Sequence, residues 1–146
     1  MRMNPSLTAA ALSAALAGVA VAGMTTPAMA GHDMTMPRGY QEYTKAAFDA
    51  AKEQRRILFF HATWCPNCRA DEADIVRNAA SIPADVVIFK ADFDKESALK
   101  KQYGIPVQDT FVLVDGTGRA VKKWAGSGLR GGGLKAILAA AFPKKM

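Results

Sequence analysis

The chain of 146 residues is poor in the residues that build metal and haem sites, since it has only two cysteines and two histidines. A closed structural zinc site usually needs four protein ligands, which makes such a site implausible here. A c-type haem attachment needs His directly after the second cysteine, where Arg69 stands. The net charge is +6, but the basic residues are scattered without interleaved aromatics, so we predict no nucleic-acid partner.

Charge is almost absent from the first thirty residues, where Arg2 is the only charged side chain. An apolar run from Leu7 to Met24 follows, and the segment closes with Ala28-Met29-Ala30. This is the order of a cleavable secretory signal peptide. We therefore predict a signal peptide over residues 1–30, cleavage near Ala30 and a periplasmic location. The run is rich in Ala and Gly, which makes it a poor bilayer span, so we expect no stable membrane span after cleavage.

Hydrophobic periodicity is also absent from residues 31–39, which we interpret as a flexible N-terminal lead-in. From residue 40 the pattern alternates between helical and strand-like segments. We predict helices over 41–54, 66–80, 95–103 and 131–142, and strands over 56–60, 86–94, 110–114 and 119–126. Parallel strands joined by helices, then an antiparallel hairpin and a closing helix, predict one three-layer α/β domain over residues 40–146. Its central mixed sheet should have about four strands flanked by helices.

Both cysteines, Cys65 and Cys68, fall in "FFHATWCPNCR", between a predicted strand and a predicted helix. They close too small a loop to restrain much of the chain, so a structural disulfide is a poor explanation of the pair. The start of a helix favours thiolate over thiol, which makes Cys65 the nucleophile candidate. Cys68, one turn further in, is placed to attack a mixed disulfide formed at Cys65. Trp64 and Pro66 would stiffen the turn.

These segments resemble the thioredoxin superfamily through "WCPNCR" at a helix start, "YGI" before the third predicted strand, and the hairpin "TFVLVDGTGRAV". The resemblance covers most of residues 40–142 and is similar to the exported thioredoxin-like branch. It implies a thioredoxin-like fold and a thiol-disulfide oxidoreductase in which Cys65 attacks, Cys68 resolves and the two form a disulfide. The implied partners are protein thiols and disulfides and an upstream electron donor, and no organic cofactor is implied.

The chain departs from the family pattern at Phe59, where cytoplasmic thioredoxins carry a buried acid that helps to move protons for the resolving cysteine. Without that acid, His61 or water would have to serve as the base. The alternative interpretation of His61 is a partly exposed structural residue at a strand end.

A second departure concerns the family's cis-proline, which begins the strand that faces the cysteines. Pro106 in "GIPV" is one candidate. In exported relatives, however, this proline stands immediately before a Thr that opens the strand, and here Asp109 precedes Thr110. We therefore expect Asp109 in this position, with Thr110 helping to shape the site. A carboxylate facing the sulfurs would disfavour thiolate and lower the reduction potential, which favours a reductase over an oxidant.

Two other functions compete with this one. A free amine at Gly31 after cleavage, with His32, Met34 and Met36 beside it, offers the imidazole and thioether donors that suit copper, and Cys65 and Cys68 could add thiolates. The competing interpretation of this tail is a leader whose methionines are incidental. The other alternative is a non-catalytic binding module that keeps a thioredoxin-like shape.

Overall fold

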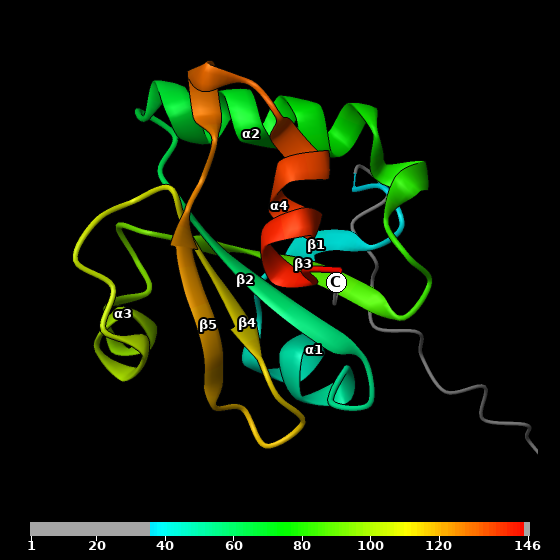
Figure 1. The fold of residues 1–146 in the computed structure, drawn as a ribbon. Helices are drawn as coiled ribbons and strands as arrows, with labels where there is room; N and C mark the ends of the chain where they lie inside the picture. The colour runs from blue at the N-terminus through cyan, green and yellow to red at the C-terminus, as the bar shows by residue number, and fades with distance from the viewer. Residues whose placement is uncertain (1–35, 145–146) are drawn as a thin grey trace, which may run out of the picture. The chain divides into compact units, whose positions relative to one another are not determined.

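The computed structural model describes residues 36–144. Within them, five strands form one mixed sheet in the order β1-β3-β2-β4-β5, flanked by helices (Figure 1). The elements are β1 (Tyr40–Glu42), α1 (Lys45–Ala50), β2 (Arg55–His61), α2 (Pro66–Arg77), η1 (Ala79–Ser81), β3 (Val86–Asp92), α3 (Ser97–Tyr103), β4 (Thr110–Val114), β5 (Ala120–Ala125), η2 (Gly128–Arg130) and α4 (Gly133–Ala141). The predicted signal peptide and residues 31–35 of the predicted lead-in lie outside the described residues.

The predicted α/β architecture with a central mixed sheet is confirmed. Strand β2 pairs parallel with β3 and antiparallel with β4, and β4 and β5 form an antiparallel hairpin at the sheet edge. Strand β1 adds a parallel pairing on the far side of β3. Because β2 and β3 are parallel, their C-terminal ends lie at the same edge of the sheet. The next element along the chain after β2 is α2, which starts at the cysteines.

The first predicted helix was too long, because its first residues belong to β1, a strand that the periodicity did not predict. Helix α1 begins only after Thr44, whose Oγ1 accepts a hydrogen bond from the Ala47 N–H at 3.1 Å. The side chains that α1 and its C-cap bury are Phe48 and Ala51 rather than an alanine stripe. A strand of three residues is too short for its alternation to stand out in a sequence.

The sheet separates two hydrophobic cores, and β2 contributes to both by alternation. Ile57 and Phe59 point to the core that α2 and α4 cover. Leu58 and Phe60 point to the opposite core, beneath α1 and α3. All four side chains are fully buried, as expected for a central strand covered on both faces. The cysteines belong to the first of these cores, so the chemistry lies on the α2–α4 side of the sheet.

Helix α2 anchors the C-terminal part of the chain through its acidic side chains. Asp74 Oδ2 accepts a hydrogen bond from the Leu134 N–H at 2.8 Å and so caps the start of α4.

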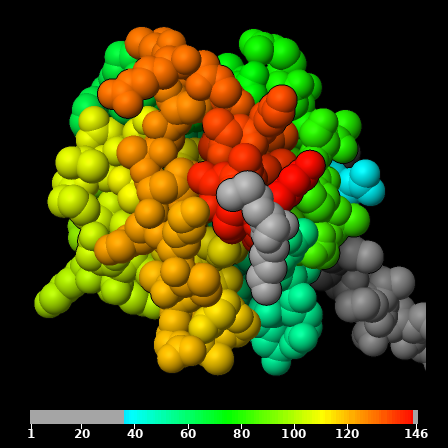
Figure 2. All heavy atoms as spheres, in the orientation of Figure 1, coloured from blue at the N-terminus to red at the C-terminus, as the bar shows by residue number. Residues whose placement is uncertain are grey.

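Figure 2 shows α4 and the β5–η2 segment adjoining one another on one face of the molecule. Val76, an apolar residue of α2, is 44% exposed. None of the helices within residues 36–144 is long and apolar enough to cross a membrane.

Candidate active site

The two cysteines lie where the chain leaves β2 and enters α2. Cys65 is the N-cap residue of α2, and its Sγ accepts a hydrogen bond from the Cys68 N–H at 3.2 Å. Pro66 takes the first helical position, where the missing N–H leaves no hydrogen bond unmade. Both sulfurs are free thiols. The positive end of the helix dipole and its unpaired N–H groups stabilise negative charge at the N-cap position.

Cys68 is the more deeply buried of the two thiols, with no exposed surface, whereas Cys65 is 3% exposed. Burial is the main reason why the pKa of Cys68 is raised, to about 12. A hydrogen bond from the backbone of Ala62 acts in the opposite direction, and the neighbouring Cys65 and Asp109 raise the pKa further. Cys68 is therefore a protonated thiol at neutral pH, and it must give up that proton when it attacks another sulfur.

Asp109 lies at the start of β4, close enough for its charge to act on Cys68. Its N–H donates to the carbonyl of Phe60 at 2.9 Å, and its own carbonyl accepts from the Gly126 N–H at 2.7 Å. Its φ of +58° is in the left-handed region, which aspartate and asparagine tolerate better than most residues. Pro106, the other candidate for this position, lies at an exposed place in the preceding loop.

The carboxyl group of Asp109 is buried without adequate hydrogen bonding. Only 8% of the residue is exposed, and Oδ1 has no hydrogen-bond partner. Burial, then the charge of Asp71 and a hydrogen bond between the two carboxyl groups, raise the pKa of Asp109 to about 7, and His61 opposes this weakly. Asp109 therefore changes its protonation state near neutral pH.

Asp71 is the site residue that the sequence interpretation missed. It lies one turn after Cys68 on α2 and is completely buried. Its two carboxyl oxygens each accept a hydrogen bond, one from the Ser127 hydroxyl and one from the Gly128 N–H, both at 2.9 Å. The available signal was the spacing of Cys68, Asp71 and Ile75, which places all three on one helical face.

Phe59 occupies the position where an acid was expected from the family pattern, and it completes an aromatic layer. Its ring stacks on that of Phe111 with centroids 4.3 Å apart, and Phe111 in turn stacks on Trp124. Phe59 is fully buried in the same core as the cysteines. Any carboxylate that serves Cys68 must therefore come from another element.

His61 is buried rather than partly exposed at a strand end, which corrects the structural alternative considered for it. Its Nε2 lies 2.9 Å from Glu72 Oε2 on α2. Lys90 Nζ and Tyr40 OH contact the other oxygen of Glu72 at 2.8 and 3.2 Å. A hydrogen bond from His61 and contacts from Lys90 hold the pKa of Glu72 down at about 2. The contact between His61 and Glu72 joins β2 to α2 directly behind the cysteines.

The remaining predicted site residues surround the pair at its surface. Trp64 is 56% exposed, and its indole N–H donates to Asp94 Oδ2 at 2.9 Å. The Thr110 hydroxyl donates to the Val107 carbonyl at 2.9 Å and so fixes the loop that leads into β4. Trp64 thus presents an apolar ring to solvent next to Cys65, while Thr110 shapes the backbone beside Asp109.

The donors proposed for copper are not gathered at one place in the described residues. Met36 packs against the core on the α2–α4 side, and His32 and Met34 lie outside the described residues. Within residues 36–144 there is no group of three or more His, Cys, Asp or Glu side chains with the geometry to hold a metal ion.

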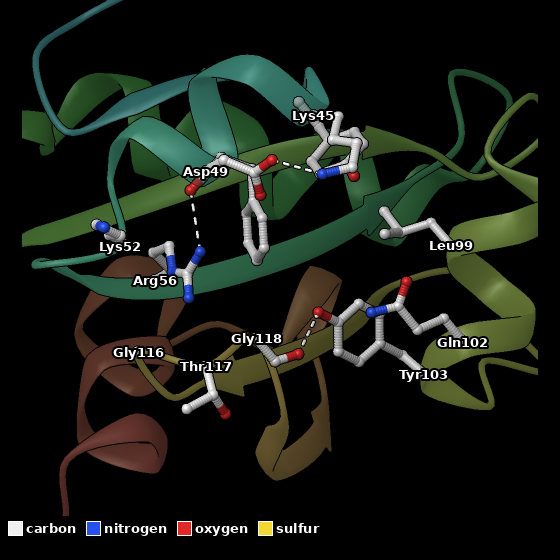
Figure 3. Close-up of a pocket in the computed structure, with 12 residues that line it drawn as sticks. Lys45, Asp49, Lys52, Arg56, Leu99, Gln102, Tyr103, Gly116, Thr117 and Gly118 are labelled. Atoms are coloured by element: carbon white, nitrogen blue, oxygen red, sulfur yellow. Dashed lines mark hydrogen bonds and ion pairs between the residues drawn. The ribbon is translucent and has the colours of Figure 1, made fainter.

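A cavity of about 360 Å³ lies on the other side of the sheet, between α1, α3 and the β4–β5 turn (Figure 3). Its polar side chains are largely occupied by the fold itself. Arg56 donates to the carbonyls of Phe48 and Asp115 at 3.0 and 2.6 Å, and the Tyr103 hydroxyl donates to the Gly118 carbonyl at 2.7 Å. Neither cysteine lines this cavity, so we place the reactive site at the start of α2 instead.

Comparison with known proteins finds relatives of this chain in both sequence and structure. The family model described as Thioredoxin matches residues 39–139. Thioredoxin H4 of Arabidopsis thaliana is 31% identical over 81 residues, which are 54% of this chain and 67% of the relative. Thioredoxin-1 of Drosophila melanogaster is 31% identical and covers 56% of this chain and 75% of its own. The crystal structure of spinach chloroplast thioredoxin F has a TM-score of 0.55 at 28% identity and covers 71% of this chain and 95% of its own.

Proposed function

Because the chain belongs to the thioredoxin family, we propose that it is an exported thiol-disulfide oxidoreductase that reduces protein disulfides through Cys65 and Cys68. The observation that carries this proposal is the position of Cys65 at the N-cap of α2, where its Sγ accepts the Cys68 N–H. A sulfur at this position has its negative charge stabilised before it meets a substrate.

The proposed reaction has two exchange steps. The thiolate of Cys65 attacks one sulfur of the substrate disulfide, forming a mixed disulfide and releasing the other substrate sulfur as a thiolate. Cys68 then loses its proton and attacks Cys65 Sγ, which forms the Cys65–Cys68 disulfide and releases the second substrate sulfur. Two electrons pass from the protein dithiol to the substrate, so an upstream electron donor must reduce the protein again.

The surroundings of Cys68 support the proposed reducing direction of electron flow. A couple becomes a strong oxidant when its reduced form is stabilised, as happens when the thiolates are stabilised. Here burial, and then Cys65 and Asp109, raise the pKa of Cys68 to about 12, which disfavours thiolate. The couple is therefore expected to be reducing. The charge of Asp109 is one contribution to the raised pKa of Cys68.

The surface around Cys65 suits an extended protein segment rather than a small molecule. Trp64 directly precedes Cys65 and is 56% exposed. Leu129 in η2 is 73% exposed, and its N–H donates to Oδ1 of Asn67, which lies between the two cysteines in the sequence. Exposed apolar side chains close to a reactive group indicate a protein contact surface. The proposal of export and a periplasmic location depends on the predicted signal peptide over residues 1–30.

The test combines insulin reduction with trapping of the mixed disulfide. Cys65→Ser should abolish turnover and form no adduct, because it removes the attacking sulfur. Cys68→Ser should also abolish turnover but accumulate a covalent adduct on Cys65, which mass spectrometry detects under non-reducing conditions. The matched control is Ser81→Ala, an exposed serine in η1, which leaves both sulfurs and their surroundings in place. A Cys65→Ser variant that still reduces insulin would refute the proposal.

A further inference from the structure

We propose that Asp71 and Asp109 together form the proton acceptor for Cys68, and that they share one proton in the resting protein. This inference rests on the proposed function, since it describes the step in which Cys68 attacks the mixed disulfide. It assigns a role to two buried carboxyl groups, one on α2 and one at the start of β4, on either side of Gly126.

The first observation is that the two carboxyl groups meet at one point. A Cβ atom added to Gly126 would collide with Asp71 Oδ2 and with Asp109 Oδ1 at the same time. The chain after β5 therefore passes both carboxyl groups so closely that only a residue without a side chain fits beside them.

The second observation is that the carboxyl groups of Asp71 and Asp109 differ in their hydrogen-bond partners. The oxygens of Asp71 accept from Ser127 and Gly128, which stabilises its ionised form. Asp109 Oδ1 is buried and has no partner. Two carboxylates are both acceptors, so a hydrogen bond between them exists only when a proton lies on one of them. Asp109 is the member whose environment favours holding that proton, because its Oδ1 otherwise stays unsatisfied.

The third observation is the position of Cys68, which lies one turn before Asp71 on the same face of α2 and, like Asp71, has no exposed surface. The pKa of Cys68, about 12, leaves almost no thiolate at neutral pH. Beside the fully ionised pair, loss of the Cys68 proton to bulk water would add a third negative charge to the buried cluster. Transfer to the carboxyl pair only moves one negative charge from the pair to the sulfur, so the net charge of the buried cluster does not change.

The groups that face the pair come from three elements. Helix α2 contributes Asp71 and Cys68, and β2 contributes His61, whose charge weakly opposes proton uptake by Asp109. The segment after β5 contributes the neutral Gly126 and the Ser127 hydroxyl.

The resolving step then balances as follows. The pair first releases its shared proton to water, which it does as the pH rises through about 7. The fully ionised pair then takes the proton from Cys68 as Cys68 Sγ forms a bond to Cys65 Sγ. The bond between Cys65 and the substrate sulfur breaks, and that sulfur leaves as a thiolate. The pair returns its proton to the departing thiolate or to water, and no further oxidant or reductant is needed.

The test separates the two exchange steps with the reagent 5,5′-dithiobis(2-nitrobenzoate) in a stopped-flow instrument. The attack of Cys65 releases a first coloured thiolate, and the attack of Cys68 on the mixed disulfide releases a second. In the wild-type chain, the rate of the second phase should rise with pH through an inflection near 7. The first phase should lack this dependence on the carboxyl pair and serves as an internal control.

Asp109→Asn is the decisive variant, because asparagine has nearly the same size and also tolerates a left-handed backbone. Its second phase should lose the inflection and slow by about tenfold or more near neutral pH, the minimum loss typical of a general base. Asp71→Asn should instead move the inflection to lower pH, because it removes the charge that raises the pKa of Asp109. Asp74→Asn, one turn further along α2, is the matched control and should keep the wild-type profile.

The outcomes distinguish this inference from its premise. If Asp109 acts only by repelling thiolate, Asp109→Asn should resolve the mixed disulfide faster than wild type, which would refute the proton-acceptor role. An unchanged inflection in Asp109→Asn would refute it as well. If the wild-type chain releases only one coloured thiolate, the Cys65–Cys68 couple itself is wrong, and the inference fails with it.

Discussion

Replacing Asp109 by asparagine is expected to stabilise the fold at alkaline pH and to leave its stability almost unchanged in acid. The wild-type carboxyl group is buried, and its Oδ1 lacks a hydrogen-bond partner. Burial first, and then Asp71, raise its pKa from 3.8 to about 7. The asparagine carries no charge, and its amide N–H is able to donate to the neighbouring Asp71 carboxylate.

The sign of the effect follows from proton linkage. Between pH 3.8 and about 7 the folded chain keeps a proton on Asp109 that the unfolded chain has already lost. Rising pH therefore favours the unfolded state across this window, and the destabilisation is complete above the folded pKa. At about 1.4 kcal/mol for each unit, the shift corresponds to roughly 4 kcal/mol. This is an upper limit, because separation of the two carboxylates or entry of water relieves part of the repulsion.

Urea unfolding of the reduced protein at about pH 4 and about pH 8 measures the effect. The free energy of unfolding of Asp109→Asn should exceed that of wild type at the higher pH and match it at the lower. Asp74→Asn removes a carboxylate from the same helix and should show no such gain, because it loses the cap on Leu134. An equal difference at both pH values, or a loss of stability at pH 8, would refute the assignment of Asp109 as a destabilising buried acid.

Two further changes test the packing around the cysteines. Glu72→Gln should lower the free energy of unfolding by about 3 kcal/mol at neutral pH. That loss should shrink as pH falls from 4.5 towards 2, because contacts led by His61 hold the pKa of Glu72 down; unfolding curves with a pH-independent loss would contradict this. Gly126→Ala should cost about 1 to 3 kcal/mol, typical of overpacking, because its methyl group meets the Asp71 and Asp109 carboxyl groups. A melting temperature equal to that of wild type would contradict the close approach.

The architecture could be predicted from the sequence because most helices and strands are long enough to show the regular spacing of their apolar residues. Strands β2 and β3 read as continuous apolar runs, and both are buried on two faces. Strand β1 has only three residues, and its pairing partner β3 lies more than forty residues further along the chain, so nothing local marks it. Such pairings depend on tertiary contacts that a sequence window does not contain.

The site was predicted where local rules apply and missed where they do not. The strand-to-helix position of Cys65 follows from Pro66 and the helical pattern after it. Asp71 was missed as a site residue, because carboxylates are rarely buried unless they are paired. Its burial depends on donors from Ser127 and Gly128, more than fifty residues away in the chain. Only the tertiary structure brings these groups together.

The buried acids connect the stability of this fold with its chemistry. An acid at the Phe59 position would have to displace a ring that stacks on Phe111 and would break the aromatic layer of the core. Placing the carboxyl groups on α2 and at the start of β4 keeps that layer intact, at the cost of holding two carboxyl groups together away from water. Asp109→Asn should therefore move two measurements in opposite directions, raising the free energy of unfolding at pH 8 while slowing the attack of Cys68. If the Asp109 carboxyl group were purely structural, its replacement would not slow the attack of Cys68. If it were purely catalytic and well solvated, its replacement would not raise the free energy of unfolding. Only both changes together fit a buried, destabilising proton acceptor.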